Sequence, residues 1–388
     1  MKKKKVAYIL TPVDFGGSER VSLNFLKHVD RGRFDIRPVV LIRPWEDEGG
    51  NIFLRELESE GYEAHKIPVA IRTKTHGRDY LRVVRCYRLI YSFLKKGSFD
   101  LVHTNGYFAD TVGIPAARFL GIPSISTCHG FIRNDMKLLI YNMLDQFVLR
   151  MAGKTIAVSE AIKEDLIRHG VKEDRIEVIT NAVNAPMNAR EMKAVRLERR
   201  AVMNLSPKDF AVCYIGRLSA EKGLKHLITA LSMIEAGAEH VKLVIIGDGP
   251  QKQELKELAE KHRVGERVVF AGFQSDVEAW IPAMDAFILP SLTEGTPMAL
   301  LEAMAYGLPS IASAVGGVPD IIDSGVNGIL VSPGRPDELK DALLRIIEDA
   351  PLRKKLSAAA RKRIRADYDV KDWARKIEAE YDKLAGQT

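Results

Sequence analysis

Cysteine is scarce in this sequence, and a long uninterrupted apolar run is missing from it. The 388 residues include only three cysteines, which lie far apart, so neither a disulfide framework nor a zinc site is indicated. The longest nearly apolar stretch, 295–318, is interrupted by Glu302, Pro309 and several glycines, which argues against a membrane-spanning helix. The initial Met-Lys-Lys-Lys-Lys precedes too short an apolar segment for a signal peptide. These absences favour a cytoplasmic protein.

Two common nucleotide- and metal-binding motifs are also missing. No Gly-x-Gly-x-x-Gly follows the first expected strand, where a simple nicotinamide dehydrogenase would carry it. Asp-x-Asp, which is typical of one class of metal-dependent enzymes, occurs only as Asp367-Tyr-Asp369. That pair stands at the foot of a C-terminal helix, where capping explains it better. No other cluster of His, Asp and Glu has the spacing of metal ligands. The sequence therefore predicts neither a metal nor a resident cofactor.

What the sequence does contain is a regular alternation of short apolar strands with amphipathic helices. This alternation is typical of parallel, doubly wound sheets. In the first half we expect strands at 5–10, 36–42, 63–67, 101–104, 124–128, 155–158 and 176–180. In the second half we expect them at 211–215, 242–246, 268–271, 286–289, 310–312 and 328–331. A turn-rich and then charged segment at 184–208 separates the halves.

We therefore expect an α/β protein with two Rossmann-like domains that face each other across a cleft. The first domain would span 1–187 and the second 188–369, with a final helix at 370–388. In sheets of this kind, ligands bind at the carboxyl ends of the strands.

The segment 291–318 is the most informative part of the chain. A nearly wholly apolar helix, opened by Pro297, carries one carboxylate, Glu302, which needs a partner if it is buried. Glu294 lies in the loop before the helix, whose N-terminus can bind an anion. Two carboxylates for hydroxyls beside an anion site suit a sugar nucleotide. The alternative is that Glu302 pairs with a distant arginine in a structural role.

A second segment, Gly216-Arg217-Leu-Ser-Ala-Glu-Lys222-Gly223, follows an expected strand and opens a helix. Arg217 and Lys222 bracket this loop and can direct two cations at one anion, such as a phosphate. The loop is not a Walker A loop, because no Gly-Lys-Ser/Thr ends it. The competing interpretation is an ordinary solvated loop.

These two segments together resemble the signature of retaining glycosyltransferases with two Rossmann-like domains (the GT-B fold), and they are most similar to glycosyltransferase family 4. The resemblance rests on Glu294-(seven residues)-Glu302 with Gly295 and Pro297, and on the Gly216-Arg217-Leu loop. It implies that Arg217 and Lys222 hold the diphosphate of the donor and neutralise it as it leaves. It also implies that the last helix crosses back onto the first domain.

The resemblance assigns further residues to the site. His129-Gly130 matches a position beside the transferred sugar, where the histidine would bind a sugar hydroxyl. Gly16 and Gly17 would line the cleft near the diphosphate or the acceptor, although Ser18 could equally be a plain helix N-cap. Phe273, in the 270–277 segment, would help to shape the base pocket. Thr296 stands where many relatives carry an aromatic residue.

The predicted function is transfer of a sugar from a nucleotide-diphosphate sugar to an acceptor hydroxyl, with retention and without a metal. The acceptor is expected to be a glycan or a lipid-linked glycan of cell-envelope, lipopolysaccharide or glycolipid synthesis. Two alternatives are a sugar-nucleotide epimerase on a similar fold and a catalytically silent sugar-nucleotide-binding protein. Net release of a nucleoside diphosphate would separate the transferase from both.

The excess of positive over negative charge lies wholly in the first half of the chain. Residues 1–180 hold 29 Lys and Arg against 22 Asp and Glu, whereas the remainder holds 29 of each. In the expected helix 78–96, Arg78, Arg82 and Arg85 form a basic stripe. The adjacent apolar stripe comprises Leu81, Val84, Tyr87, Tyr91 and Leu94.

A basic amphipathic helix of this kind suits peripheral contact with an anionic membrane at the inner face of the cell. The alternative is a solvated helix whose apolar stripe packs on the sheet. No nucleic-acid partner is expected, because no reading motif accompanies the charge.

Overall fold

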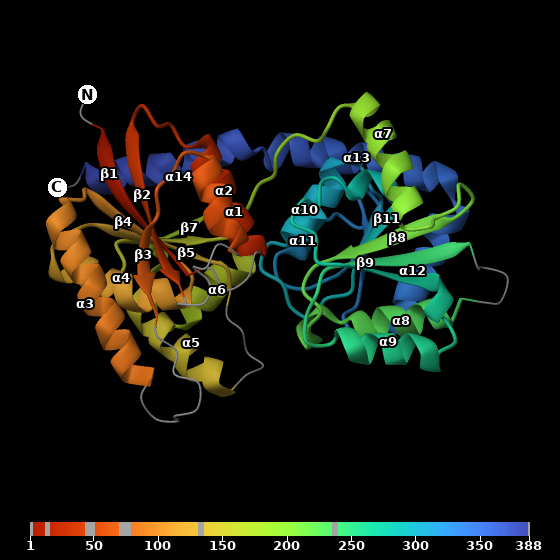
Figure 1. Cartoon of the computed structure of the whole chain (residues 1–388), viewed down its shortest axis with the longest axis horizontal. Coiled ribbons are helices and arrows are strands. Elements are labelled where there is room, and N and C mark those ends of the chain that lie inside the picture. Colours follow the sequence, from red (N-terminus) through yellow and green to blue (C-terminus); the bar gives the residue numbers. More distant parts are fainter. Residues whose placement is uncertain are drawn as a thin grey trace. The chain divides into compact units, whose positions relative to one another are not determined.

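The computed structural model describes residues 3–11, 16–42, 51–69, 79–130, 136–234 and 240–386. The chain divides into two compact units (Figure 1). The first comprises Met1–Asn181 and Val370–Thr388, and the second comprises Ala182–Asp369. The division thus lies at Asn181, whereas the sequence analysis placed it after residue 187.

The first unit is built on a parallel sheet of seven strands in the order β3-β2-β1-β4-β5-β6-β7. The strands are β1 (Lys4–Leu10), β2 (Phe34–Ile42), β3 (His65–Pro68), β4 (Leu101–Asn105), β5 (Ser124–Cys128), β6 (Lys154–Ala157) and β7 (Ile176–Val178). The helices are α1 (Gly17–His28), α2 (Ile52–Ser59), α3 (Asp79–Gly97), α4 (Tyr107–Phe119), α5 (Met136–Leu149), α6 (Glu160–Arg168) and α14 (Val370–Ala385). Strand order reverses between β1 and β4, which is where such sheets bind ligands.

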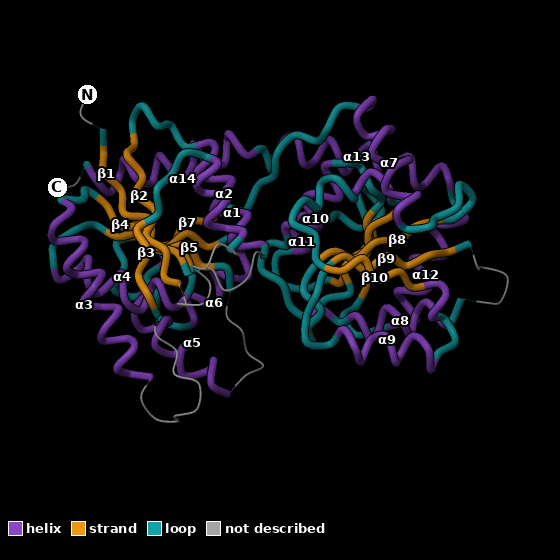
Figure 2. The backbone as a smooth tube through the Cα atoms, in the orientation of Figure 1, coloured by secondary structure: helices purple, strands orange, loops and turns teal. Residues whose placement is uncertain are grey.

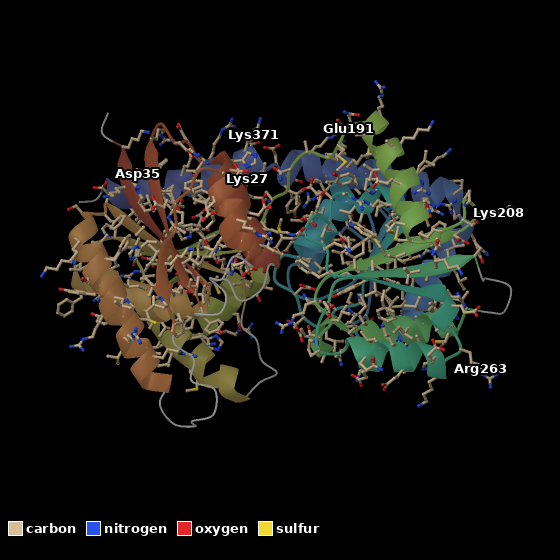
Figure 3. The ribbon with its side chains drawn as sticks, in the orientation of Figure 1. Lys27, Asp35, Glu191, Lys208, Arg263 and Lys371 are labelled. Carbon is tan, nitrogen blue, oxygen red and sulfur yellow. The ribbon has the colours of Figure 1, made fainter. Side chains whose placement is uncertain are left out.

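The second unit repeats the design with six parallel strands in the order β10-β9-β8-β11-β12-β13 (Figure 2). They are β8 (Phe210–Ile215), β9 (Val241–Ile246), β10 (Val268–Gly272), β11 (Ala286–Leu289), β12 (Ser310–Ser313) and β13 (Ile329–Val331). The helices are α7 (Ala189–Val202), α8 (Leu224–Ser232), α9 (Lys252–Lys261), α10 (Met298–Ala305), α11 (Val318–Ile321), α12 (Pro336–Glu348) and α13 (Ala350–Asp367). Charged side chains such as Glu191, Lys208 and Arg263 lie on its surface (Figure 3). Here the order reverses between β8 and β11.

The expected fold class is confirmed, since each expected strand overlaps an observed one in two parallel sheets. The strands could be recognised because parallel strands are covered by helices on both faces and therefore read as continuous apolar runs. In β8, β9 and β11 nearly every residue is buried.

Helix α14, at the C-terminal end of the chain, packs into the first unit. Its Trp373 and Tyr381 rings lie edge-on to Phe25 of α1, with centroids 6.1 and 5.8 Å away. Buried Glu378 accepts a hydrogen bond from the Asp30 backbone N–H at 2.8 Å and pairs with Arg33 at 3.0 Å. Apolar burial and a paired carboxylate therefore hold this helix, which is distant in sequence from the strands it covers.

The expected apolar stripe of α3 is not available to a membrane as a whole. Leu94 is buried, and Tyr87 and Tyr91 pack against the core that α3 and α4 share with the sheet. Val84 alone among the four described residues of the stripe is largely exposed, at 49 %. Arg78 lies outside the described residues, and the side chain of Leu81 is not described. The apolar stripe of α3 therefore packs largely into the core, while Arg85 and Arg88 of the same helix remain exposed.

No helix within the described residues is long and apolar enough to cross a membrane.

Candidate active site

The loop after β8 is held between two neighbouring loops of the second unit. The Gly216 N–H donates to the Ile246 carbonyl at 3.0 Å, and the Leu218 N–H donates to the Asp248 carbonyl at 2.9 Å. On its other side, the Leu292 N–H donates to the Glu221 carbonyl at 2.8 Å. Backbone hydrogen bonds thus fix the loop at the point where strand order reverses.

Two glycines let these loops approach more closely than any side chain would permit. Gly223 has a φ of +66°, and a Cβ there would lie 2.1 Å from the Pro290 carbonyl oxygen. Gly316 has a φ of +54°, and a Cβ there would lie 1.7 Å from the Glu294 carbonyl oxygen. A substitution of Gly223 would therefore push the Lys222 loop away from the segment that leads to Glu294, and a substitution of Gly316 would push the loop after β12 away from Glu294.

Lys222 and Glu294, which the sequence analysis assigned separately, are in direct contact. The Lys222 Nζ lies 2.8 Å from Glu294 Oε1, which also accepts a hydrogen bond from Ser291 Oγ at 2.6 Å. The Glu294 side chain is only 7 % exposed, whereas that of Lys222 is 24 % exposed. The Glu294 carboxylate is thus held in place by an opposite charge, while part of the Lys222 side chain still faces solvent.

Arg217 lies at the start of the same loop and is exposed. Within the described residues, no carboxylate or carbonyl group accepts from its guanidinium. Its backbone is anchored, because the Tyr214 hydroxyl donates to the Arg217 carbonyl at 2.9 Å. Burial raises the pKa of Tyr214 well above its ordinary value, so this donor stays protonated. An anchored backbone with an available guanidinium is suited to binding an anion.

Glu302 lies inside α10, a helix that is buried along almost its whole length. Glu302 is only 6 % exposed, and it interacts with other groups of the protein. Pro297 is the N-cap, one position before the place expected for it, and Thr296 before it is 8 % exposed. The Gly295 carbonyl accepts from the Gly317 N–H at 2.9 Å, so the loop before α10 is also fixed.

Phe273 is not brought next to these residues. It follows β10, the edge strand of the sheet, which β9 separates from β8. Its ring is 43 % exposed, which is high for a large apolar side chain.

In the first unit, His129 follows β5 and contacts Asn105 at the end of β4. Asn105 Nδ2 donates to Ser22 Oγ at 3.0 Å and to the Tyr8 hydroxyl at 3.2 Å. This leaves Asn105 Oδ1 to accept from His129 Nε2–H at 2.9 Å. Burial lowers the pKa of His129 to about 4, so the ring is neutral near pH 7. It can hydrogen-bond a hydroxyl, but it is a weak base.

His103, in the middle of β4, has both ring nitrogens occupied. They lie 2.6 Å from the Tyr381 hydroxyl of α14 and 2.8 Å from Thr127 Oγ1. Burial lowers its pKa to about 3. His103 therefore joins α14 to the sheet and has a structural role.

Gly16 and Gly17 stand at the start of α1, beside the same strand ends. Gly16 is the N-cap, and its N–H is bound by Glu19 Oε2 at 3.0 Å. Ser18 lies inside the helix, so the alternative in which Ser18 caps it is wrong. The two glycines follow β1, whose last residue, Leu10, pairs with Asn105 of β4.

Asn105 is the residue that sequence reasoning missed. The sequence analysis assigned it no role, yet its contact with the ring orients His129. Its position at the end of the strand that pairs with β1 was a usable signal, because strand order reverses there. Within the described residues, no cluster of His, Cys, Asp and Glu could hold a metal ion.

Two family models match the chain, one in each half. The model described as Glycosyltransferase Family 4 matches residues 15–185. The model described as Glycosyl transferases group 1 matches residues 195–363. The chain belongs to this family of glycosyltransferases. The second match contains Arg217, Lys222, Glu294 and Glu302, and the first contains His129.

Curated and solved relatives of this glycosyltransferase agree with that assignment. The chain is 28 % identical over 359 residues to an Escherichia coli UDP-Gal:alpha-D-GlcNAc-diphosphoundecaprenol alpha-1,3-galactosyltransferase, covering 90 % of this chain and 89 % of the relative. Anabaena HepE, solved in complex with UDP-glucose, matches with a TM-score of 0.80 and 22 % identity over 98 % of this chain and all of that one. WaaG, a glycosyltransferase involved in lipopolysaccharide biosynthesis, matches with a TM-score of 0.73 and 18 % identity over 98 % and 100 %. These structures share the GT-B fold.

Proposed function

We propose that this glycosyltransferase moves a sugar from a nucleotide-diphosphate sugar to an acceptor hydroxyl, retains the anomeric configuration and needs no metal. The observation that carries the proposal is the contact of Lys222 with Glu294 beside an available Arg217, at the carboxyl ends of β8 and β11. A UDP-glucose complex of HepE and a UDP-galactose-dependent relative support a nucleotide donor.

The donor sits on the second unit in this proposal. Arg217 and Lys222 contact the diphosphate, Glu294 accepts from hydroxyls of the transferred sugar, and Glu302 accepts from the ribose. Gly216, Gly295, Thr296 and Pro297 supply the backbone around it, and Phe273 contributes to the base pocket. The ion pair of Lys222 with Glu294 places a cation for the diphosphate next to a carboxylate that can accept from sugar hydroxyls.

Catalysis is mainly electrostatic. As the bond from the anomeric carbon to the phosphate oxygen breaks, negative charge grows on the departing diphosphate, and Arg217 and Lys222 stabilise it. The acceptor oxygen forms the new bond on the same face, and its proton passes to the departing phosphate oxygen. His129 is too weak a base for that proton, so it positions a sugar hydroxyl, while Gly16 and Gly17 border the diphosphate or the acceptor.

The acceptor in this proposal is a lipid-linked or envelope glycan, and the protein works at the inner face of the cell membrane as a peripheral protein. The undecaprenol-linked acceptor in the name of the E. coli relative supports this, as does the part of WaaG in lipopolysaccharide biosynthesis. The exposed cations of α3 support an anionic surface as partner.

The donor is tested by thermal shift against a panel of nucleotide sugars. A donor present at about 100 times its Kd should stabilise the fold by about 2.7 kcal/mol. Released nucleoside diphosphate is then measured with and without acceptor. Stabilisation without net release would support an epimerase or a silent binding protein and contradict the transferase.

A further inference from the structure

The side chains that the structure describes in α5 are those of its C-terminal half, 143–149, and the exposed ones among them are mostly apolar. The exposed fractions are 66 % for Met143, 44 % for Leu144 and 60 % for Phe147, and these residues lie close together on one side of the helix. The whole of α5 contains only two charged residues, Lys137 and Asp145. A helix on the surface of a water-soluble domain normally presents its polar residues to solvent, whereas the described C-terminal half of α5 presents apolar ones.

The opposite side of α5 is fixed by a buried polar group. Asp145 is 4 % exposed and is hydrogen-bonded to Asp110 of α4, which accepts a further hydrogen bond from Ser126 Oγ at 2.7 Å. Val148 and Leu149 are buried beside Asp145. Rotating α5 to hide Phe147 would break this carboxyl pair, so the exposure of the apolar face follows from the fold.

Cations border the apolar face on the same side of the sheet. Helix α4 lies between α3 and α5 and is buried along nearly its whole length, so α3 and α5 form the outer surface (Figure 1). Phe119, at the end of α4, is 76 % exposed, and its ring centroid is 5.9 Å from that of Tyr91 on α3. The exposed cations of this surface are Arg85, Arg88, Lys95 and Lys96 on α3, Arg118 on α4, and Arg150 after α5.

We propose that this surface, which we call the α3–α5 face, docks on an anionic lipid bilayer. Met143, Leu144, Phe147 and Phe119 insert at the boundary of headgroups and acyl chains, and the cations contact anionic headgroups. The combination of apolar side chains with surrounding positive charge matches such an interface. That docking gives the enzyme access to a lipid-linked acceptor rests on the proposed function. The docking itself is independent of that function.

The first test is co-sedimentation of the full chain with vesicles. Phosphatidylcholine vesicles are compared with vesicles that also contain phosphatidylglycerol, at low and moderate salt. We expect binding only to the anionic vesicles, weakened by salt. Met143→Ser with Phe147→Ser should weaken it by about tenfold or more. Arg85→Glu with Arg88→Glu should weaken it by at least about fivefold for each cation removed.

Matched control variants lie in the second unit. Leu197→Ser with Val202→Ser removes two apolar side chains that are 68 % and 61 % exposed. Lys193→Glu with Lys208→Glu reverses two exposed cations. Both controls should bind the anionic vesicles as the unchanged chain does. An equal loss in the controls would contradict a localised face.

A second test reports insertion at one position. Phe147→Trp should show a blue-shifted emission with anionic vesicles and quenching by lipids brominated along their acyl chains, whereas Leu197→Trp should show neither. Equal recovery of the protein with both lipids, or an unshifted emission from the bound Phe147→Trp variant, would overturn the proposal. So would dimerisation in the absence of lipid that Phe147→Ser abolishes, because that outcome assigns the face to a second copy of the chain.

Donor affinity separates this proposal from the proposed function. The α3–α5 variants should keep the thermal shift with nucleotide sugars that the unchanged chain shows. Loss of vesicle binding with intact donor binding supports the docking face, whereas vesicle binding without any nucleotide-sugar binding would leave docking standing and contradict the transferase.

Discussion

At the scale of single residues, the site depends on how two cations are held. Arg217 is exposed on an anchored backbone, and Lys222 is fixed against a buried carboxylate. A cation with a fixed position loses little free energy to reorganisation when charge develops on a leaving group. The conformations of the loops that hold Arg217 and Lys222 therefore matter as much for leaving-group stabilisation as the charges of the two residues.

Arg217→Ala and Lys222→Ala should each reduce kcat/KM strongly. A contact to a charged group is worth about 1.5–3 kcal/mol, or about 10- to 150-fold. Lys225→Ala serves as the control, because Lys225 is on α8 and pairs with Glu254 at 2.5 Å. Near-normal turnover in both variants, measured by nucleoside diphosphate release, would contradict the diphosphate assignment.

Glu302 and Glu294 should separate binding from transfer. Glu302→Ala should raise the Kd for the donor about tenfold or more, because ribose hydroxyls lose a charged acceptor. Glu294→Ala should mainly lower kcat, because it leaves Lys222 unpaired and removes the acceptor for sugar hydroxyls. Calorimetry measures the Kd for the donor, and a turnover assay measures kcat. A lowered melting temperature with unchanged donor affinity in Glu302→Ala would favour the structural interpretation.

The carboxyl pair Asp110–Asp145 should make stability depend on pH. Burial raises the pKa of Asp110 to about 6, and that of Asp145 well above its ordinary value, with Asp145 holding the shared proton. Because the pKa of Asp110 is raised on folding, its contribution to the free energy of unfolding is complete below the ordinary pKa near 3.8. That contribution is lost as the pH rises through about 6.

The melting temperature of Asp145→Asn relative to that of the unchanged chain should therefore rise as the pH is raised, because the substitution removes a buried carboxyl group whose pKa is well above its ordinary value. Comparing the two proteins cancels the opposite effect of His103, whose pKa is lowered. Asp341→Asn, at an exposed carboxylate, is the control and should show a constant difference. A pH-independent difference for Asp145→Asn would contradict the shared proton.

At the scale of elements, the strands could be predicted and the roles of the helices only in part. Strands buried on both faces give apolar runs of recognisable length, as in 211–215 and 286–289. The apolar stripe of α3 carries the same periodicity whether it faces a membrane or the sheet, so periodicity could not decide between them.

The apolar face of α5 was not predicted, because the sequence of this helix resembles that of an ordinary core helix. Likewise, the Lys222–Glu294 contact joins loops about 70 residues apart, which spacing alone does not reveal.

Helix α14 should be essential for the first unit. Trp373 is 5 % exposed and contacts Phe25, so Trp373→Ala should cost about 3–5 kcal/mol of unfolding free energy. Arg375→Ala, at a side chain that is 72 % exposed, should cost little. Denaturant unfolding measures both. Equal stability of the two variants would show that α14 contributes no core.

At the scale of the whole molecule, charge and chemistry are divided between the units. The second unit carries the cations that we assign to the donor, and the first carries the excess positive charge and the apolar face of α5. This division suits an enzyme that takes its donor from solution and its acceptor from a lipid surface.

The most direct test of the account is transfer from a nucleotide sugar to an undecaprenol-diphosphate-linked GlcNAc analogue in the presence of EDTA. Nucleoside diphosphate release and the anomeric configuration of the product, by proton NMR, are recorded together. The account predicts one equivalent of nucleoside diphosphate per glycoside formed, an unchanged configuration, and full activity with the chelator. A product of inverted configuration, or activity that EDTA abolishes and magnesium or manganese restores, would contradict it.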